Sequence, residues 1–588
     1  MRRLIAGVGC GCMMMMAASG APGDGGMDAR LDAFFQRYLE ARFQQEPLWA
    51  TRLGDHRFDA LLEDLSPAAR AAWVELDRRT LEALPREIEY QRLSRDRQID
   101  FEILRQELTQ AIWQAENLRP FEEDPRVYNR YLSDSVFLLL AQSTLPRETN
   151  VAHCLARMRQ MPKVVAAARA NLSNPPRPLV ETAIRQNRGA IAFYEGGLFE
   201  LAGKTRQLAA LKAAAREVAA CLKDYQQFLE QELLPRAGGE WRLGKEKFSR
   251  KFELEMDAGV TADQVLEEAE AEFGRVEREM YVIARQLWSR LFPGKVLPPD
   301  DAAGRRATVQ GVLGRIAEDH STPKTLVSDV RKTAARIKRF IRQADILRLP
   351  EPDACRIIEM PEFQRGNSTA YMNSPPPLDP KAAGYYAVSP PPRDWDAARV
   401  KSFFEEYNRQ MLQILTIHEA YPGHYVQFEY SNRKPSPIRR VLASGPFVEG
   451  WAVYTEQMML DQGYGDGSLE LRLTQLKFYL RAVANAILDH KMHCAGMTDD
   501  EALRFLTEQA CQAEGEARLK VIRAKQSSVQ LSTYFVGRMA HYRLRQSLQR
   551  EMGEAFDLGR YHEAVLAHGP VPLKYLPELV RARLQEPR

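Results

Sequence analysis

Residues 416–427 read Thr416-Ile417-His418-Glu419-Ala420-Tyr421-Pro422-Gly423-His424-Tyr425-Val426-Gln427. In the zinc-peptidase pattern H-E-x-x-H, the two histidines are four residues apart, and about 400° of helical turn brings both rings to one face. Here His424 comes six residues after His418. On an unbroken helix this spacing gives about 600° of turn, which points the two rings to opposite sides. If the two rings share a metal ion, the helix must therefore be interrupted between them.

The residues between the histidines favour such an interruption. Pro422 lacks a backbone donor, and Gly423 accepts backbone angles that other residues avoid. We interpret the stretch as a zinc motif with a two-residue insertion, in which both His418 and His424 bind the metal. The alternative is a pair of capping or core histidines. Glu419 argues against that alternative, because burying a carboxylate is costly unless it has a charge partner or a proton role.

A third metal ligand is expected on a later helix. Glu449 follows His424 by 25 residues, which leaves room for a turn and a second helix. Glu456 comes two helical turns after Glu449 on the same face, and we expect it to orient a ligand histidine. The alternative is that both glutamates are solvated, but their neighbours include the apolar Val448 and Trp451. Three protein ligands would leave a fourth position open, as in catalytic zinc sites.

The catalytic roles follow from this ligand set. Glu419 is the expected general base, since a carboxylate beside the metal can carry a proton from water to the leaving amine. Two groups are candidates for a donor to the developing oxyanion: Tyr534, and His493 with Asp489 four residues before it as its orienting partner. For each of them a packing role is the alternative. The sequence leaves open which arginine would hold a substrate carboxylate, among Arg481, Arg523, Arg538 and Arg545.

The composition of the 588-residue chain is that of a globular protein, with 45% hydrophobic and 27% charged residues. A net charge of +4 without a dominant basic run excludes an evident nucleic-acid surface. Arg2 and Arg3 precede an uncharged run over residues 4–18, which predicts an export signal and a periplasmic or envelope-attached protein. Cys10 is a candidate for lipid attachment. No later stretch is long and apolar enough to predict a membrane span.

The chain divides into three predicted regions: a signal over residues 1–21, a helical region over 28–240, and a helical region with the zinc site over 241–588. The fold class is mainly α with a small β element beside the active-site cleft. Residues 384–388 have strand character, and the prolines around them favour an edge position, where a peptide backbone could pair with the strand. An ordinary surface loop is the alternative.

Four stretches resemble the domain-of-unknown-function 885 (DUF885) family, which is grouped with the zincin-like metallopeptidases. They comprise Ala50 to Ser66, His418 to Gln427, Glu449 to Glu456, and the segments with Asp489, His493 and Gln530 to Arg545. The resemblance implies an exported, mostly helical protein with a zinc-hydrolase fold, without defining a substrate. Before Gln530 the family favours a Pro-Gly pair, where this chain has Ser527-Ser528-Val529.

The sequence therefore predicts an exported zinc metallopeptidase that acts on short peptides. Two alternatives stay open at this point. One is an envelope protein that binds metal or peptide without turnover, although such a protein would not need Glu419. The other is a zinc hydrolase of another amide or ester.

Overall fold

A computed structural model describes residues 25–588 apart from 361–369, 380, 393–394, 435 and 588. The predicted export signal and Cys10 lie outside the described residues. The chain is mainly helical with one small sheet, as the sequence predicts. Among the described helices, none combines the length and apolarity that a bilayer crossing requires.

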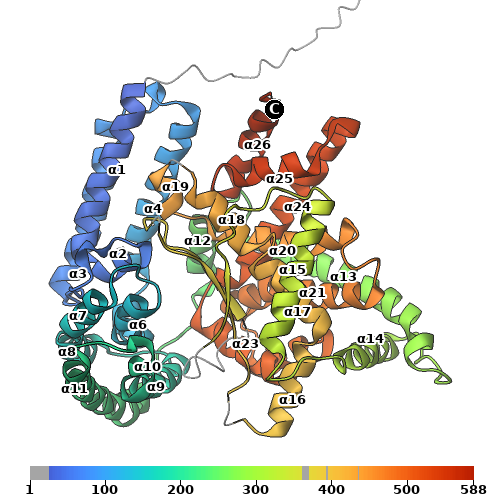
Figure 1. The fold of residues 1–588 in the computed structure, drawn as a ribbon, viewed down its shortest axis with the longest axis horizontal. Coiled ribbons are helices and arrows are strands. Elements are labelled where there is room, and N and C mark those ends of the chain that lie inside the picture. Colours follow the sequence, from blue (N-terminus) through green and yellow to red (C-terminus); the bar gives the residue numbers. More distant parts are fainter. Residues whose placement is uncertain (1–24, 361–369, 380, 393–394, 435, 588) are drawn as a thin grey trace, which may run out of the picture.

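The N-terminal half is a succession of helices (Figure 1). The first four are α1 (Gly25–Gln45), α2 (Pro47–Leu53), α3 (Pro67–Glu87) and α4 (Arg95–Asn117). The next seven are α5 (Pro120–Glu123), α6 (Arg126–Ala141), α7 (Arg147–Met158), α8 (Met161–Asn171), α9 (Arg177–Ala192), α10 (Leu198–Ala202) and α11 (Leu208–Gln227).

The C-terminal half contains the sheet and the remaining helices. Before the sheet come α12 (Gly244–Met256), α13 (Ala262–Leu291), α14 (Ala302–Ala317) and α15 (Leu326–Gln343). After it come α16 (Ala397–Glu406), α17 (Arg409–Glu419), α18 (His424–Asn432), α19 (Pro437–Val441), α20 (Gly445–Asp461) and α21 (Leu469–Cys494). The last are α22 (Asp499–Arg504), α23 (Glu514–Gln526), α24 (Thr533–Met552), α25 (Leu558–Leu566) and α26 (Leu576–Gln585).

Helix α13 illustrates how local sequence sets these elements. Thr261 accepts a hydrogen bond from the backbone N–H of Gln264, and the Gln264 side chain accepts one from the backbone N–H of Thr261. This reciprocal cap satisfies two backbone donors at the helix start. Val265, Ala269 and Phe273 then recur at a spacing of four and are buried.

Two apolar cores are present, and their division differs from the order of the chain. Helices α6 to α11, which we call the N-terminal lobe, form the second core. The last buried residue of this core is Leu233. The first core joins α1, α3 and α4 to the helices of the C-terminal half. The chain thus leaves the lobe near the predicted boundary at residue 240, whereas most buried apolar residues between 27 and 108, Leu65 apart, share the core of the C-terminal region.

The sheet has three strands in the order β1-β3-β2, with β1 over Arg356–Glu359, β2 over Ala370–Asn373 and β3 over Tyr385–Val388. Strand β3 pairs in parallel with β1 and antiparallel with β2. The predicted strand at residues 384–388 is thus present, but its expected edge position is wrong, because β1 and β2 occupy both of its sides. The edge strand that contacts α17 is β2.

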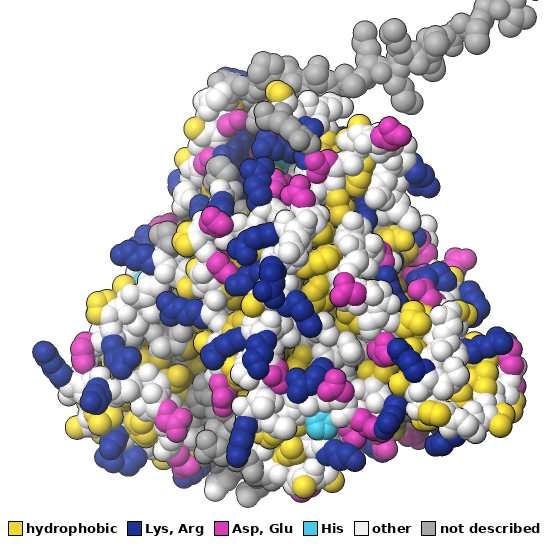
Figure 2. Space-filling model, turned by 45° about the vertical axis from the view of Figure 1, so that its right-hand side comes forward, with side chains coloured by type: hydrophobic (Ala, Val, Ile, Leu, Met, Phe, Trp, Pro, Cys, Tyr) yellow, Lys and Arg dark blue, Asp and Glu magenta, His cyan; other side chains and the backbone are white. Residues whose placement is uncertain are grey.

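The charges on the surface are mixed. On the face in Figure 2, lysine and arginine side chains are spread over the surface with acidic side chains between them. This distribution agrees with the small net charge of the chain. It offers no single basic surface of the kind that binds nucleic acid on this face.

Candidate metal centre

The helix is interrupted between the two histidines, as the sequence predicts. Helix α17 ends at Glu419 and α18 begins at His424. The backbone N–H of Gly423 donates to the carbonyl of Ile417 over 3.0 Å, which folds the turn back on the end of α17. A Cβ atom on Gly423 would lie 1.9 Å from the carbonyl oxygen of His418, so only glycine fits at this position.

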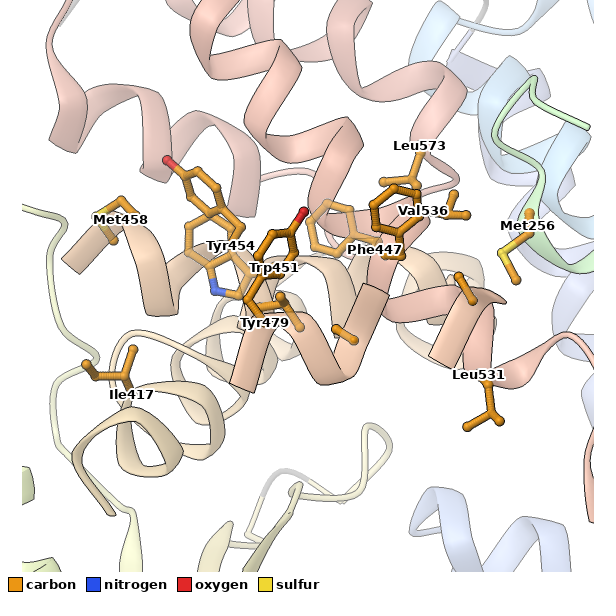
Figure 3. Close-up of a cluster of buried hydrophobic side chains, with 14 of the residues drawn as sticks. Met256, Ile417, Phe447, Trp451, Tyr454, Met458, Tyr479, Leu531, Val536 and Leu573 are labelled. Carbon is orange, nitrogen blue, oxygen red and sulfur yellow. The ribbon is translucent and has the colours of Figure 1, made fainter. Parts of the chain in front are cut away.

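Helix α20 holds this turn from the other side. The indole N–H of Trp451 donates to the carbonyl of Pro422 over 2.9 Å. Trp451 is fully buried in the first core, where Figure 3 shows it on the same helix as Phe447 and Tyr454. Because Glu449 lies two residues before Trp451, the contact that fixes the turn also fixes the third candidate ligand.

The structure brings together the side chains of His418, His424 and Glu449, whose candidate ligand atoms all lie within 4.8 Å of one another. The Oε2 atom of Glu449 is 3.9 Å from Nε2 of His418 and 3.5 Å from Nε2 of His424. Tetrahedral ligands about 2 Å from an ion lie about 3.3 Å apart, so small movements would close the group around a cation. Two imidazoles and one carboxylate are also a donor set that suits such an ion.

Glu456 orients the first histidine. Its Oε1 atom lies 2.7 Å from Nδ1 of His418, and its side chain is fully buried. Burial lowers the pKa of His418 to about 3, with His424 adding to this effect and Glu449 opposing it. A neutral His418 that donates its Nδ1 proton to Glu456 leaves the Nε2 lone pair directed at Glu449 and His424, which is how metal-binding histidines are usually held.

The charges of the other two ligands are balanced against each other. Burial alone would lower the pKa of His424, but its contact with the Glu449 carboxylate outweighs burial and raises it. Burial alone would raise the pKa of Glu449, but His424, His418 and Arg523 together lower it. Nδ1 of His424 is buried and lacks a hydrogen-bond partner among the described residues.

Glu419 lies between the metal ligands and the edge of the sheet. Its Oε2 atom accepts a hydrogen bond of 2.9 Å from the backbone N–H of Met372 in β2. Burial raises the pKa of Glu419 to about 7, and Glu449 adds to this rise, whereas His424 and the Met372 N–H oppose it. A carboxyl group whose pKa lies near neutrality can both accept and release a proton, as a general base requires.

Tyr534 lies at the start of α24, near Glu449. Its hydroxyl accepts a hydrogen bond of 3.2 Å from the Arg523 guanidinium, which also donates to Gln530 over 2.8 Å. Burial raises the pKa of Tyr534, and the nearby Glu449 carboxylate raises it further. The hydroxyl therefore keeps its proton and can donate it in a hydrogen bond beside the ligand group.

Tyr534 of α24 and Glu449 of α20 lie near each other because these two helices cross closely. A Cβ atom on Gly450 would lie 2.3 Å from the Cα of Gly537, and one on Gly537 would lie 1.9 Å from the carbonyl oxygen of Pro446. Helices α20 and α24 can approach this closely only because both positions are glycine. Gly450 and Gly537 both lie in the stretches that resemble the family, but no local pattern of the sequence predicts that they meet.

The predicted pairing of Asp489 with His493 is wrong. The Asp489 carboxylate accepts hydrogen bonds from the backbone N–H groups of Val529 and Ser532 and from the Ser532 hydroxyl. His493 instead contacts backbone groups, with Nε2 3.0 Å from the carbonyl oxygens of both Ala524 and Ser527. Although the two side chains share a helix, long-range partners separate their roles, and both residues hold the segment between α23 and α24.

This segment explains the departure from the family pattern before Gln530. Val529 has a φ of 70°, a left-handed conformation that favours glycine. The Pro-Gly pair that the family favours would supply glycine for this turn without strain. In this chain the hydrogen bond from the Val529 N–H to Asp489, 3.0 Å long, holds the turn in place.

The four candidate arginines differ in their partners. Arg481 forms an ion pair with Glu516 over 3.0 Å. Arg538 contacts Gln457 and lies over two tyrosine rings. Arg545 is buried beside Tyr454. Arg523 alone of the four touches Tyr534.

The N-terminal stretch that resembles the family lies away from the ligands. The His56 ring contacts the Asp59 carboxylate through Nδ1 over 2.8 Å and the Asp379 carboxylate through Nε2 over 3.3 Å. Asp379 belongs to the connection between β2 and β3. This stretch therefore anchors the sheet to the N-terminal helices and contributes no group to the candidate metal centre.

Comparison with known proteins agrees with this fold. The family model described as "Bacterial protein of unknown function (DUF885)" matches residues 47–580. The solved structure of a "putative lipoprotein of unknown function" from Shewanella oneidensis is 30% identical with a TM-score of 0.79, and the match covers 94% of this chain and 99% of that one. A "putative lipoprotein" from Colwellia psychrerythraea has the same fold at 18% identity, with a TM-score of 0.77 and coverage of 95% and 99%.

No curated protein matches the chain. The family match spans the stretch with His56, the helices that carry His418, His424 and Glu449, and the helix with Tyr534. The chain therefore belongs to the DUF885 family.

Proposed function

We propose that this chain is an exported zinc-dependent metallopeptidase with a zincin-like catalytic region, and that it hydrolyses peptide bonds of short peptides. The observation that carries the proposal is the convergence of His418, His424 and Glu449 on one point with Glu419 beside them. Zinc suits two imidazoles and one carboxylate, and three protein ligands leave a position for substrate. When bound, zinc would polarise the scissile carbonyl and lower the pKa of water.

The side chains around the ligand group fit the steps of hydrolysis. Glu419 would take a proton from the attacking water and deliver it to the leaving nitrogen. The Tyr534 hydroxyl would donate a hydrogen bond to the developing oxyanion. Strand β2 forms the edge of the sheet next to Glu419, which accepts the Met372 N–H, so an extended peptide could lie along this edge.

The preference for short peptides rests on the position of the N-terminal lobe. Gln142 of the lobe donates to Asn373 at the end of β2 over 2.6 Å. On the other side, Gln526 at the end of α23 donates to Thr182 of the lobe over 2.5 Å. The lobe thus contacts both β2 and α23, and its helices can be followed in Figure 1. A body placed there would limit the length of the bound peptide.

Export and attachment to the envelope are part of the proposal. Arg2, Arg3 and the uncharged run over residues 4–18 support export. The 30% identical protein from Shewanella oneidensis is described as a lipoprotein, which supports lipid attachment at Cys10.

The test combines metal analysis with digestion of a peptide library. We expect the zinc-loaded wild type to cleave peptides, and Glu419→Gln to retain zinc while losing at least about 100-fold in kcat/KM, the lower range for loss of a general base. Glu429→Gln on α18 is the control, because Glu429 pairs with Arg433 outside the ligand group. Unchanged cleavage by Glu419→Gln would refute the role of Glu419. A protein that holds zinc but cleaves nothing would favour the non-catalytic binder, and cleavage of esters alone would favour another hydrolase.

A further inference from the structure

Helix α23 carries two cationic side chains that lack an acidic partner, three residues apart and therefore on one face of the helix. Arg523 donates to Gln530 and Tyr534 and forms no ion pair with a described residue. Lys520 is 5% exposed and makes neither a hydrogen bond nor an ion pair within the described part of the chain. Lysines are rarely buried without a charge partner, so we expect Lys520 to have an anionic partner.

The surroundings of Lys520 strengthen this argument. Burial lowers the pKa of Lys520 far below its ordinary value, and the charges of Arg481 and Arg523 lower it further. Glu516 is the carboxylate that opposes them, and it is already engaged by Arg481 over 3.0 Å. Glu516 is therefore not available to Lys520, and an anion bound beside Lys520 would keep its ammonium group charged. We call Lys520 and Arg523 the cationic wall.

The position of this wall relative to the metal ligands is the second observation. Arg523 donates to the Tyr534 hydroxyl over 3.2 Å. Tyr534 lies three residues before Gly537, where α24 packs against Gly450, the residue that follows Glu449. The cationic wall therefore begins next to the ligand group. An anion bound to this wall would therefore lie near a bond held at the metal.

We propose that Lys520 and Arg523 bind a carboxylate of the substrate beside the metal centre, and that the favoured substrates are peptides whose free C-terminal carboxylate lies close to the scissile bond. This inference rests on the proposed function and assigns it an exopeptidase mode. Arg523 and Lys520 act in it as specificity-determining residues. Helix α23 also touches the lobe through Gln526 and Thr182, so the lobe would close the site beyond the carboxylate.

The first test measures hydrolysis by the full zinc-loaded chain. It uses tripeptides with a free carboxylate, the same tripeptides as carboxamides, and carboxamides that end in glutamate. We expect the free acids to exceed the carboxamides about 10- to 100-fold in kcat/KM, the range expected for hydrogen bonds to a charged group. Rescue by the terminal glutamate would show that a side-chain carboxylate serves instead, and would overturn the C-terminal assignment.

Variants on α23 show whether these residues cause the preference. Arg523→Ala should reduce it to about twofold or less through loss of activity on the free acids alone. Arg518→Ala is the matched control, since Arg518 is exposed on the same helix and paired with Glu514. Lys520→Met should also reduce the preference while raising the melting temperature, because an apolar side chain replaces a buried unpaired charge. A drop in stability without a change in the preference would assign Lys520 to structure only and contradict its role.

A binding experiment separates this inference from the proposed function. Calorimetry with mercaptoacetyl-alanine and its carboxamide requires zinc and the cationic wall but no turnover. We expect the acid to bind about 10- to 100-fold more tightly, and the difference to vanish in Arg523→Ala. Tighter binding of the acid without any peptide cleavage would refute the peptidase and keep the carboxylate site. Equal binding of acid and carboxamide by a protein that cleaves peptides would refute the carboxylate site and keep the peptidase.

Discussion

Trp451 donates its indole N–H to the carbonyl of Pro422 over 2.9 Å, and this contact ties the helix with Glu449 to the turn between His418 and His424. The two residues are 29 positions apart in the chain. The hydrogen bond links the two segments that carry the three candidate ligands. The geometry of the ligand group therefore depends on a residue that does not touch the metal position itself.

The first prediction concerns this contact. Trp451→Phe removes the hydrogen bond but retains an aromatic ring in the core. We expect zinc affinity to fall about tenfold, because the turn would no longer be fixed relative to Glu449. Competition with a chromophoric chelator measures the affinity. Tyr479→Phe, a change to another buried aromatic of the first core, is the control. If Trp451→Phe lowers the melting temperature but leaves zinc affinity intact, the turn does not depend on this hydrogen bond.

The second prediction concerns the buried carboxylate behind His418. Glu456→Gln replaces an acceptor of the Nδ1 proton by an amide that can turn its donor toward the ring. We expect zinc affinity to decrease about 10- to 100-fold, which is the usual cost of losing the partner of a ligand histidine. Asp461→Asn at the end of the same helix serves as the control, because Asp461 pairs with Arg472. An equal loss of zinc affinity in both variants would mean that the removed negative charge, and not the orientation of His418, causes the effect.

The third prediction tests the crossing of α20 and α24. Gly537→Ala places a Cβ atom 1.9 Å from the carbonyl oxygen of Pro446, and the clashing atoms belong to backbones that cannot turn aside. We expect a loss of about 1–3 kcal/mol in the free energy of unfolding, as for other overpacked cores. Urea denaturation measures it. Gly445→Ala on α20 is the matched control, since the added Cβ meets nothing within 4 Å. Equal stability of the two variants would show that the helices can separate without cost.

The fourth prediction is a pH dependence of the N-terminal anchor. The hydrogen bond to Asp59 raises the pKa of His56; burial opposes this rise, and Asp379 adds to it. A raised folded-state pKa means that the protonated ring stabilises the fold. This stabilisation is complete below the unfolded-state value of about 6.5 and is lost as the pH rises through the folded-state pKa.

The measurement for this prediction compares melting temperatures of the wild type and His56→Gln between about pH 5 and pH 9. We expect the wild type to be more stable by a few degrees at the acidic end and the difference to shrink at the alkaline end. His320→Gln is the control, because His320 contacts a backbone carbonyl and forms no ion pair with a described residue. A gap that widens with rising pH would contradict the assignment of a cationic His56.

Much of the candidate site could be predicted from local sequence. The spacing of His418 and His424 requires an interrupted helix, and Pro422 and Gly423 provide it, since helical periodicity and backbone restrictions act over a few residues. Glu449 was predictable as their companion because a carboxylate among apolar neighbours needs a cation. Local patterns also predicted the strand at residues 384–388, but pairing depends on the whole sheet, and β1 and β2 leave that strand no free edge.

The sequence by itself thus determined the helical class, the interruption of the helix between His418 and His424, and the choice of Glu449 as the residue that meets them. Only the tertiary structure decided the hydrogen-bond partners of the polar groups at the site. The backbone N–H of Met372 donates to Glu419, Asp489 accepts from Val529 and does not contact His493, and Arg523 is the candidate arginine that donates to Tyr534. The physical reason is the range of the interactions. A helix turn or a glycine is dictated by its immediate neighbours, whereas a buried polar group takes its partner from whichever distant segment the packed core places beside it.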